Sequence, residues 1–114
     1  MLKGRVISGD KIGLTLGFPT ANINISPEDT GLAQGVYAAT VLVRDVSHYG
    51  ALVINTRHNK VEVFIIGFGE TIYDEKISID PKKKVSDLIS YSSAKEIKQK
   101  IRNDIEKVKD FFKI

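Results

Sequence analysis

The sequence predicts a mainly β protein, a small antiparallel barrel or sandwich followed by one C-terminal α-helix. Six short β-compatible segments recur at spacings of about ten residues between Leu2 and Ile79, and turn-forming residues separate them. From Ser92 onward the hydrophobic period changes to three or four residues, which is the period of an α-helix. No internal repeat, low-complexity segment or long linker interrupts the chain, so we expect a single domain over residues 1–114.

The first three predicted strands lie in the N-terminal half of the chain. Residues 2–7 form a short β-compatible segment with apolar and charged side chains interleaved. Residues 21–25 alternate between apolar and polar side chains until Ser26 and Pro27 break the pattern. Residues 36–44 follow a Gly-bounded loop and form the clearest predicted strand, because β-branched and apolar side chains occupy most of its length.

The other three predicted strands are residues 50–55, 61–68 and 72–79. We expect a turn at residues 45–49 and a polar corner at residues 56–60. Lys82, Lys83 and Lys84 follow Pro81 and are predicted to form a solvated connector. A minor role of these lysines in attracting a phosphate-bearing ligand stays open.

The C-terminal segment predicts an amphipathic helix whose apolar face consists of Ile97, Ile101, Ile105, Val108 and Phe112. Ser93 and Glu96 have the spacing of a capping box, with Ser93 as the N-cap. We expect this helix to lie across the barrel and to cover its open end or one wall. A membrane surface or a partner groove is the alternative for a basic amphipathic helix, and the acidic residues on this one argue against it.

Composition excludes several classes of protein. Cysteine is absent, so the chain has no disulfide framework and no thiolate site. The N-terminus continues from Met1 directly into a charged segment, and no run reaches the ~20 apolar residues that a membrane-spanning helix needs. We therefore expect a soluble cytoplasmic protein with no membrane partner, and we treat it as a monomer.

The charge balance suits a small anionic ligand or a solvated helix. The formal net charge is +3 at pH 7, and the sequence pI is about 9.1. A small barrel that binds nucleic acid is an alternative reading of this pI and of the strand number. The predicted strands, however, lack the interleaved aromatic side chains on which bases stack, so we expect no nucleic-acid partner.

The segment from Gly13 to Asn22 is the first candidate site. It is a Gly-rich loop that follows a predicted strand and presents the side-chain oxygens of Thr20 and Asn22. Glycines allow backbone N–H groups to approach an anion, and neutral oxygens can ligate a hard cation that keeps its phosphate and water ligands. The loop is not a Walker loop, because no Gly-Lys-Ser/Thr follows. Its composition alone is also that of a tight turn between two strands.

Glu62 is the second candidate, a carboxylate flanked by apolar residues in the middle of the β series. On a strand it shares a face with Phe64 and Ile66, so it points either to solvent beside an apolar patch or into a cleft. In a cleft it could serve as a general base that takes a proton from an alcohol as the alcohol attacks a phosphoryl group. The only histidines, His48 and His58, are expected in solvated turns, without a second ligand at metal spacing.

One string of the loop is highly specific, Gly-Phe-Pro-Thr-Ala-Asn at residues 17–22. Other segments accompany it in a consistent order: residues 4–9, Gly-Val-Tyr-Ala at 35–38, Gly50 with Ile54, Thr56 and Arg57, residues 61–63 with Phe68 and Tyr73, and residues 91–101 with Asp104. Together they resemble the riboflavin kinase family, whose domain also forms the C-terminal half of bifunctional bacterial FAD synthetases. The resemblance covers essentially the whole chain.

This resemblance implies a six-stranded Greek-key barrel that transfers the γ-phosphate of ATP to the ribityl 5′-hydroxyl of riboflavin. Riboflavin and ATP are then the implied partners, and Mg²⁺ is the implied cofactor. The implied nucleotide-binding residues are Gly13, Gly17, Phe18, Pro19, Thr20 and Asn22. The resemblance further implies that Thr20 and Asn22 hold the Mg²⁺ and that Glu62 orients and deprotonates the 5′-hydroxyl.

The chain departs from the family pattern mainly at its flavin end. Leu14 stands where the loop usually has Arg or Lys, and Gly67 stands where the family has Asp. Residues 58–60 replace the family's Pro-Thr-Phe, and residues 86–91 lack the Arg and Glu of the segment that lies near the flavin. A degenerate relative of the same barrel, which binds a flavin or a nucleotide without turnover, is therefore the alternative function.

Overall fold

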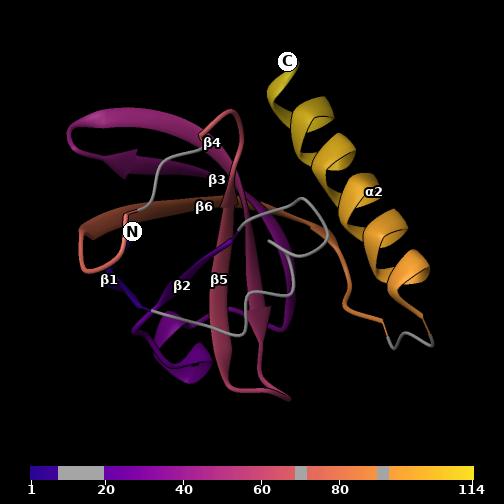
Figure 1. Cartoon of the computed structure of the whole chain (residues 1–114), viewed down its shortest axis with the longest axis horizontal. Helices are drawn as coiled ribbons and strands as arrows, with labels where there is room; N and C mark the ends of the chain where they lie inside the picture. The colour runs from indigo at the N-terminus through magenta and orange to yellow at the C-terminus, as the bar shows by residue number, and fades with distance from the viewer. Residues whose placement is uncertain (8–19, 69–71, 90–92) are drawn as a thin grey trace.

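The computed structural model of the chain describes residues 1–7, 20–68, 72–89 and 93–114. The strands among them form a closed antiparallel barrel in the order β1-β2-β5-β4-β3-β6 (Figure 1). They are β1 (Leu2–Ile7), β2 (Ala21–Ile23), β3 (Gly35–Val43), β4 (Val46–Asn55), β5 (Lys60–Ile65) and β6 (Lys76–Ser86). A short 3-10 helix, η1 (Pro27–Thr30), precedes β3, and the helix α2 (Ala94–Phe112) follows β6. The predicted mainly β fold with a C-terminal helix is confirmed.

The strand order identifies the barrel as a Greek key. β3, β4 and β5 are consecutive antiparallel neighbours, and β6 returns to pair with β3. The order β6-β3-β4-β5 is the Greek-key arrangement. β6 also pairs with β1, which closes the sheet on itself and distinguishes a barrel from a sandwich.

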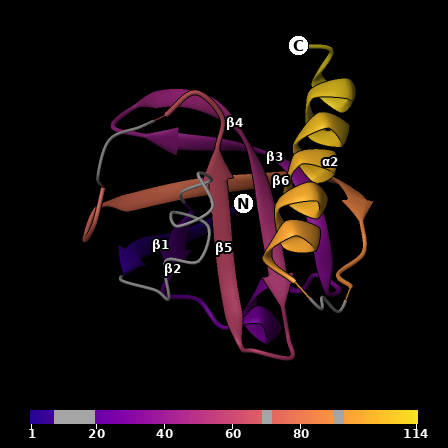
Figure 2. The ribbon, with the colours of Figure 1, turned by 45° about the vertical axis from the view of Figure 1, so that its right-hand side comes forward.

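Strand alternation divides the apolar side chains between two cores. The barrel interior holds the larger one, with fully buried residues such as Val41, Leu52 and Val63. The second core lies on the outer face of β3 and β4, where Ala38 and Ala51 pack with Val108 of α2. Figures 1 and 2 show α2 along one side of the barrel. The helix therefore covers one wall of the barrel.

The start of α2 is set by the predicted cap. Ser93 has extended backbone angles, and its hydroxyl accepts a hydrogen bond from the Glu96 backbone N–H at 3.2 Å. This bond satisfies one of the N–H groups that have no partner within the helix. None of the described helices has both the length and the apolar character that a membrane crossing requires.

The turn between β3 and β4 is shorter than the sequence predicts. Arg44 and Asp45 both have positive φ values, 48° and 65°. Two successive left-handed residues make a tight hairpin turn whose twist matches that of the flanking strands. The ladder consequently continues to the pair Val43 and Val46. The predicted turn at residues 45–49 is wrong, because β4 begins at Val46 and includes residues 46–49.

The last strand is displaced toward the C-terminus relative to the prediction. β6 runs from Lys76 to Ser86, so residues 72–75 precede it and the predicted connector at residues 82–84 belongs to it. The register between β3 and β6 shifts by one residue between Ala38, which pairs with Lys83, and Ala39, which pairs with Pro81. This shift leaves Lys82 unpaired as a bulge, and a bulge is one of the places where a sheet tolerates proline. Pro81 therefore does not end the strand.

Gly4 occupies a position where a larger side chain has no room. A Cβ at this position would lie 2.5 Å from Ile23 Cγ2 and 3.0 Å from the Asn24 Oδ1. Ile23 is buried and β-branched, so its methyl group cannot move away at low cost. We expect Gly4→Ala to lower the free energy of unfolding by about 1–3 kcal/mol, measured by chemical denaturation.

Gly31 provides the matched control for this prediction. It has a φ of 71°, and a Cβ there would meet no atom within 4 Å. Asparagine tolerates the left-handed region, so Gly31→Asn is expected to change stability little. An unchanged denaturation midpoint for Gly4→Ala would contradict the close packing of β1 against β2.

Candidate active site

Thr20, Asn22 and Glu62 lie together on the outer face of the barrel. β2 pairs with β5 so that Asn22 is directly opposite Glu62. Opposite residues of an antiparallel pair project to the same face of the sheet, and Thr20 is two positions before Asn22. The Thr20 hydroxyl donates a hydrogen bond to Glu62 Oε2 at 3.0 Å. The fold thus joins the end of the predicted loop to a carboxylate from a later strand.

The alternation of β5 explains why Glu62 faces outward. Val61, Val63 and Ile65 are buried in the barrel interior, whereas Glu62 and Phe64 are half-buried on the other face. This face is not open solvent, because α2 lies over the same side of the barrel. Of the two orientations that the sequence leaves open for Glu62, the structure has the one toward a cleft.

The cleft is a groove of about 730 Å³ between the outer face of β3–β5 and the wall formed by α2 and the segment after β6. Its polar lining residues are Thr20, Gln34, Asn55, Arg57, His58, Lys60, Glu62 and Asp104. Its apolar lining residues are Val36, Ala51, Val53, Phe64, Leu88, Ile89, Ile97, Ile101 and Ile105. A volume of this size lies within the roughly 300–1,000 Å³ of small-molecule sites.

Polarity changes along the groove in the order of the β4–β5 ladder. Lys60 is paired with Asn55 beside the turn, Glu62 with Val53 one step along the same face, and Phe64 with Ala51 beyond it. The carboxylate therefore stands between a polar end near the turn and an apolar part. Such a groove suits a ligand with a polar end and an apolar body.

Gln34 holds the polar end in shape, a role that no sequence pattern indicates. Its side-chain oxygen accepts hydrogen bonds from the Thr56 backbone N–H at 3.1 Å and the Thr56 hydroxyl at 2.8 Å. It also accepts one from the Arg57 backbone N–H at 3.3 Å. Three donors on one acceptor fix the β4–β5 turn beside the groove.

Part of the predicted site is outside the described residues. Gly13, Gly17, Phe18 and Pro19 belong to residues 8–19, so the expected phosphate cradle stays a prediction. Within the described residues no group of three or more His, Asp or Glu side chains could hold a metal ion. The oxygen donors that lie together are the Thr20 hydroxyl, the Asn22 amide and the Glu62 carboxylate.

These donors suit a magnesium ion that keeps phosphate and water ligands, and they do not suit a cation bound by protein alone. The Thr20 hydroxyl gives its only proton to Glu62, which leaves its lone pairs available to a cation. Asn22 is 9% exposed, and its side chain carries an amide oxygen on the same face. The residues present therefore fit Mg²⁺.

The two histidines differ from each other. His48 was predicted in a turn and instead lies in β4, half-buried, with its ring edge-on to Phe68 at a centroid distance of 5.1 Å. His58 lies in the β4–β5 turn, as predicted, and lines the groove. Its backbone N–H donates to the Asn55 side-chain oxygen at 3.1 Å.

The lysine run on β6 is partly compensated by acidic neighbours. Lys82 donates to Asp80 at 2.6 Å, and this hydrogen bond lowers the pKa of that carboxyl. Lys84 pairs with Asp87 at 2.8 Å, which raises the pKa of the lysine and lowers that of the aspartate. The run therefore offers less free positive charge than its sequence indicates.

Nearly the whole chain matches one family model. The model described as riboflavin kinase aligns with residues 1–112. This chain belongs to the riboflavin kinase family. The sequence resemblance drawn from the loop string and its accompanying segments is confirmed.

The curated relatives of this chain include longer enzymes of the riboflavin kinase family. The bifunctional riboflavin kinase/FMN adenylyltransferase of Buchnera aphidicola (subsp. Schizaphis graminum) is 33% identical over 99% of the chain. The RNA-binding riboflavin kinase RibR of Bacillus subtilis is 29% identical over 100% of the chain. The chain spans 39% of the length of the first relative and 52% of the second.

Solved structures show the same fold at lower identity. The riboflavin kinase of Trypanosoma brucei superposes with a TM-score of 0.71 and 22% identity, covering 98% of this chain and 78% of its own. A Streptococcus pneumoniae protein named macrolide-efflux protein gives a TM-score of 0.77 at 24% identity, covering 91% of this chain and 36% of its own. At these identities the likeness establishes the barrel alone.

Proposed function

We propose that this chain, as one riboflavin kinase-like domain over residues 1–114, transfers the γ-phosphate of ATP to the ribityl 5′-hydroxyl of riboflavin and forms FMN. The observation that carries the proposal is the meeting of Thr20 and Glu62 in the groove beside α2, with Asn22 directly opposite Glu62 in the β2–β5 pair. Membership of the riboflavin kinase family supports the same reaction.

Phosphoryl transfer is catalysed mainly by positioning and by electrostatic stabilisation. We propose that Thr20 and Asn22 hold Mg²⁺ and the nucleotide phosphates, covered by the loop that contains Gly13, Gly17, Phe18 and Pro19. When bound, Mg²⁺ would neutralise charge on the phosphate oxygens. The single carboxylate in this donor set leaves the phosphates of ATP to supply further oxygens.

Glu62 is proposed as the general base. Its carboxylate would accept the proton of the 5′-hydroxyl as that oxygen attacks the γ-phosphorus. The hydrogen bond from Thr20 occupies Oε2, so it would fix the carboxylate orientation and leave Oε1 for the substrate. Thr20 would thus connect the metal end of the site to the base.

The apolar part of the groove is the proposed place for the flavin ring. Phe64 and Val53 offer a surface on the barrel side, and Ile97 and Ile101 face them from α2. The segment whose family charges are missing contributes Leu88 to the same lining. The departures at the flavin end therefore keep an apolar wall, which is compatible with a planar ring.

The direct test is FMN formation. Purified protein is incubated with riboflavin, ATP and Mg²⁺, and the products are separated by chromatography. We expect FMN and ADP in equal amounts, and no FMN when Mg²⁺ is chelated. An intact folded protein that makes no FMN under these conditions would refute the proposal.

The altered flavin-end motifs favour a second candidate, a relative that binds flavin or nucleotide without turnover. Calorimetry separates the two: binding of riboflavin or Mg-ATP without product supports the second candidate. The RNA-binding name of the Bacillus relative suggests one more control. A gel shift at several salt concentrations would reveal RNA binding by this chain, because phosphate contacts make such binding salt-dependent.

A further inference from the structure

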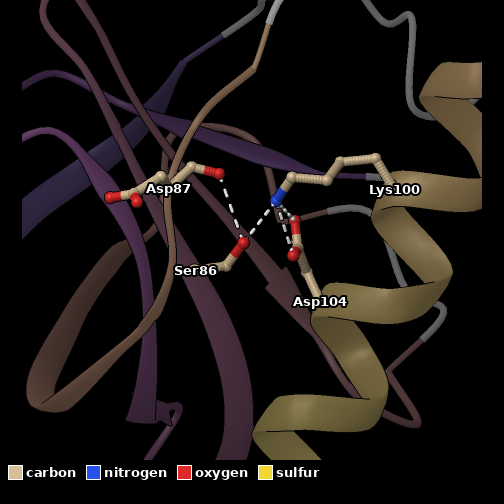
Figure 3. A network of polar contacts seen from close by, with 4 residues as sticks. All are labelled: Ser86, Asp87, Lys100 and Asp104. Carbon is tan, nitrogen blue, oxygen red and sulfur yellow. Dashed lines mark hydrogen bonds and ion pairs between the residues drawn. The ribbon is translucent and has the colours of Figure 1, made fainter.

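A buried polar cluster joins α2 to the end of β6 (Figure 3). Lys100 Nζ donates to both carboxylate oxygens of Asp104 at 2.6 Å and to Ser86 Oγ at 2.5 Å. The Ser86 hydroxyl in turn donates to the Asp87 backbone oxygen at 3.2 Å. We call Ser86, Lys100 and Asp104 the Lys100 cluster.

The Lys100 cluster is less exposed than the Lys109–Glu106 ion pair of the same helix. The side chains of Lys100 and Asp104 are only 11% and 10% exposed, whereas both members of the Lys109–Glu106 pair on the same helix are exposed by 38% or more. The three N–H groups of the ammonium are matched by three acceptors. Buried charges require such partners, so the cluster constrains geometry where a surface pair does not.

The position of the cluster is informative for function. Ser86 is the last residue of β6, directly before the segment that gives Leu88 and Ile89 to the groove. Asp104 itself lines the groove, on the same helix as Ile97 and Ile101. The helix is thus bonded at this cluster to the end of β6, directly before the segment that forms the other part of the wall.

We propose that the Lys100 cluster is a positioning device that holds the apolar wall of the groove at the spacing that the flavin ring requires. Lys100 and Ser86 are positioning residues, because they act through the side chains of the wall. The inference rests on the proposed riboflavin kinase function. A wall that is fixed before binding spares the substrate the entropic cost of ordering it.

The test compares Ser86→Ala and Lys100→Met with the wild-type chain. Ser86→Ala removes the bridge to β6 and keeps the Lys100–Asp104 pair, so we expect this variant to fold. Lys100→Met leaves the buried Asp104 carboxylate without its partner and is the variant more easily lost to misfolding. We expect the KM for riboflavin to rise about 5- to 10-fold in Ser86→Ala, comparable to ordering one more side chain on binding. The KM for ATP and kcat should stay within about twofold, since the nucleotide end is untouched.

Two control variants accompany these measurements. Ser86→Thr keeps a hydroxyl and should restore the riboflavin KM, and Lys109→Met removes an exposed lysine of the same helix and should change nothing. An unchanged riboflavin KM in Ser86→Ala, or a loss confined to kcat, would overturn the proposal.

Hydrogen exchange gives a readout that does not depend on catalysis. Amides of residues 94–105 should exchange faster in Ser86→Ala than in Lys109→Met, because the helix has lost its bond to β6. If the wild-type chain makes no FMN, the proposed function fails. Hydrogen exchange and the affinity for riboflavin then still test whether the Lys100 cluster holds the wall. Equal exchange in the two variants would show that the cluster does not hold the wall.

Discussion

Replacing Glu62 with glutamine is expected to lower kcat for FMN formation by at least about 100-fold, the usual contribution of a general base. Glutamine has the same shape and can still accept the hydrogen bond from Thr20 through its amide oxygen. It cannot take a proton from the 5′-hydroxyl. The KM values for riboflavin and ATP should change little, because the groove and the donor set keep their form.

Steady-state kinetics and a thermal melt on the same preparation check this prediction. Glu28→Gln is the matched control, since Glu28 is exposed in η1 and is not a lining residue of the groove. Its activity should equal that of the wild type. A Glu62→Gln variant that keeps its activity within about threefold would remove Glu62 from the role of base.

The second large effect is expected at Thr20. Thr20→Val keeps the side-chain shape and removes the hydroxyl, and with it the donor to Glu62 and the oxygen that we propose as a ligand of the metal. We expect kcat to fall by about 10- to 100-fold, the range typical of lost metal ligation and its supporting bonds. The Mg²⁺ concentration for half-maximal rate should rise at the same time.

A magnesium titration of activity measures both effects. Thr20→Ser retains the hydroxyl and should recover most of the rate. Thr40→Val, at a β3 residue that does not line the groove, should behave like the wild type. If Thr20→Val lowered the rate with an unchanged Mg²⁺ requirement, the hydroxyl would serve only to orient the carboxylate.

The sequence predicted which residues share a face of β5 better than it predicted the strand ends. Along β5, Glu62 lies on one face of the sheet and the adjacent, buried Val63 on the other face. This alternation with a period of two is a strong local signal. The pairing of Asn22 with Glu62, however, depends on β2 returning beside β5, which no local pattern encodes. The resemblance to a known family supplied that long-range information.

The errors have local physical causes. Arg44 and Asp45 form a left-handed turn without the Gly or Asn that usually marks one, so the start of β4 was missed. Pro81 and the lysines after it look like a loop, yet the bulge at Lys82 lets β6 continue to Ser86.

The Lys100 cluster was not predicted for another reason. In the sequence, Asp104 is one of several acidic residues of the amphipathic helix and is expected on its polar face, whereas the structure buries it. Lys100 and Asp104 are one helical turn apart, a spacing common to exposed pairs. Only the position of Ser86 beside them distinguishes this pair as buried and bonded to the barrel.

The most direct test of the proposed mechanism is a crystal structure of the protein with riboflavin, Mg²⁺ and a non-hydrolysable ATP analogue. The proposed mechanism predicts the ribityl 5′-oxygen within about 2.6–3.2 Å of a Glu62 carboxylate oxygen, the hydrogen-bond reach of a general base. It also predicts the Mg²⁺ ligated by Thr20 and Asn22, and the flavin ring between Phe64 and Ile101. A flavin bound in the groove with its 5′-hydroxyl turned away from Glu62, or a metal held elsewhere, would contradict it.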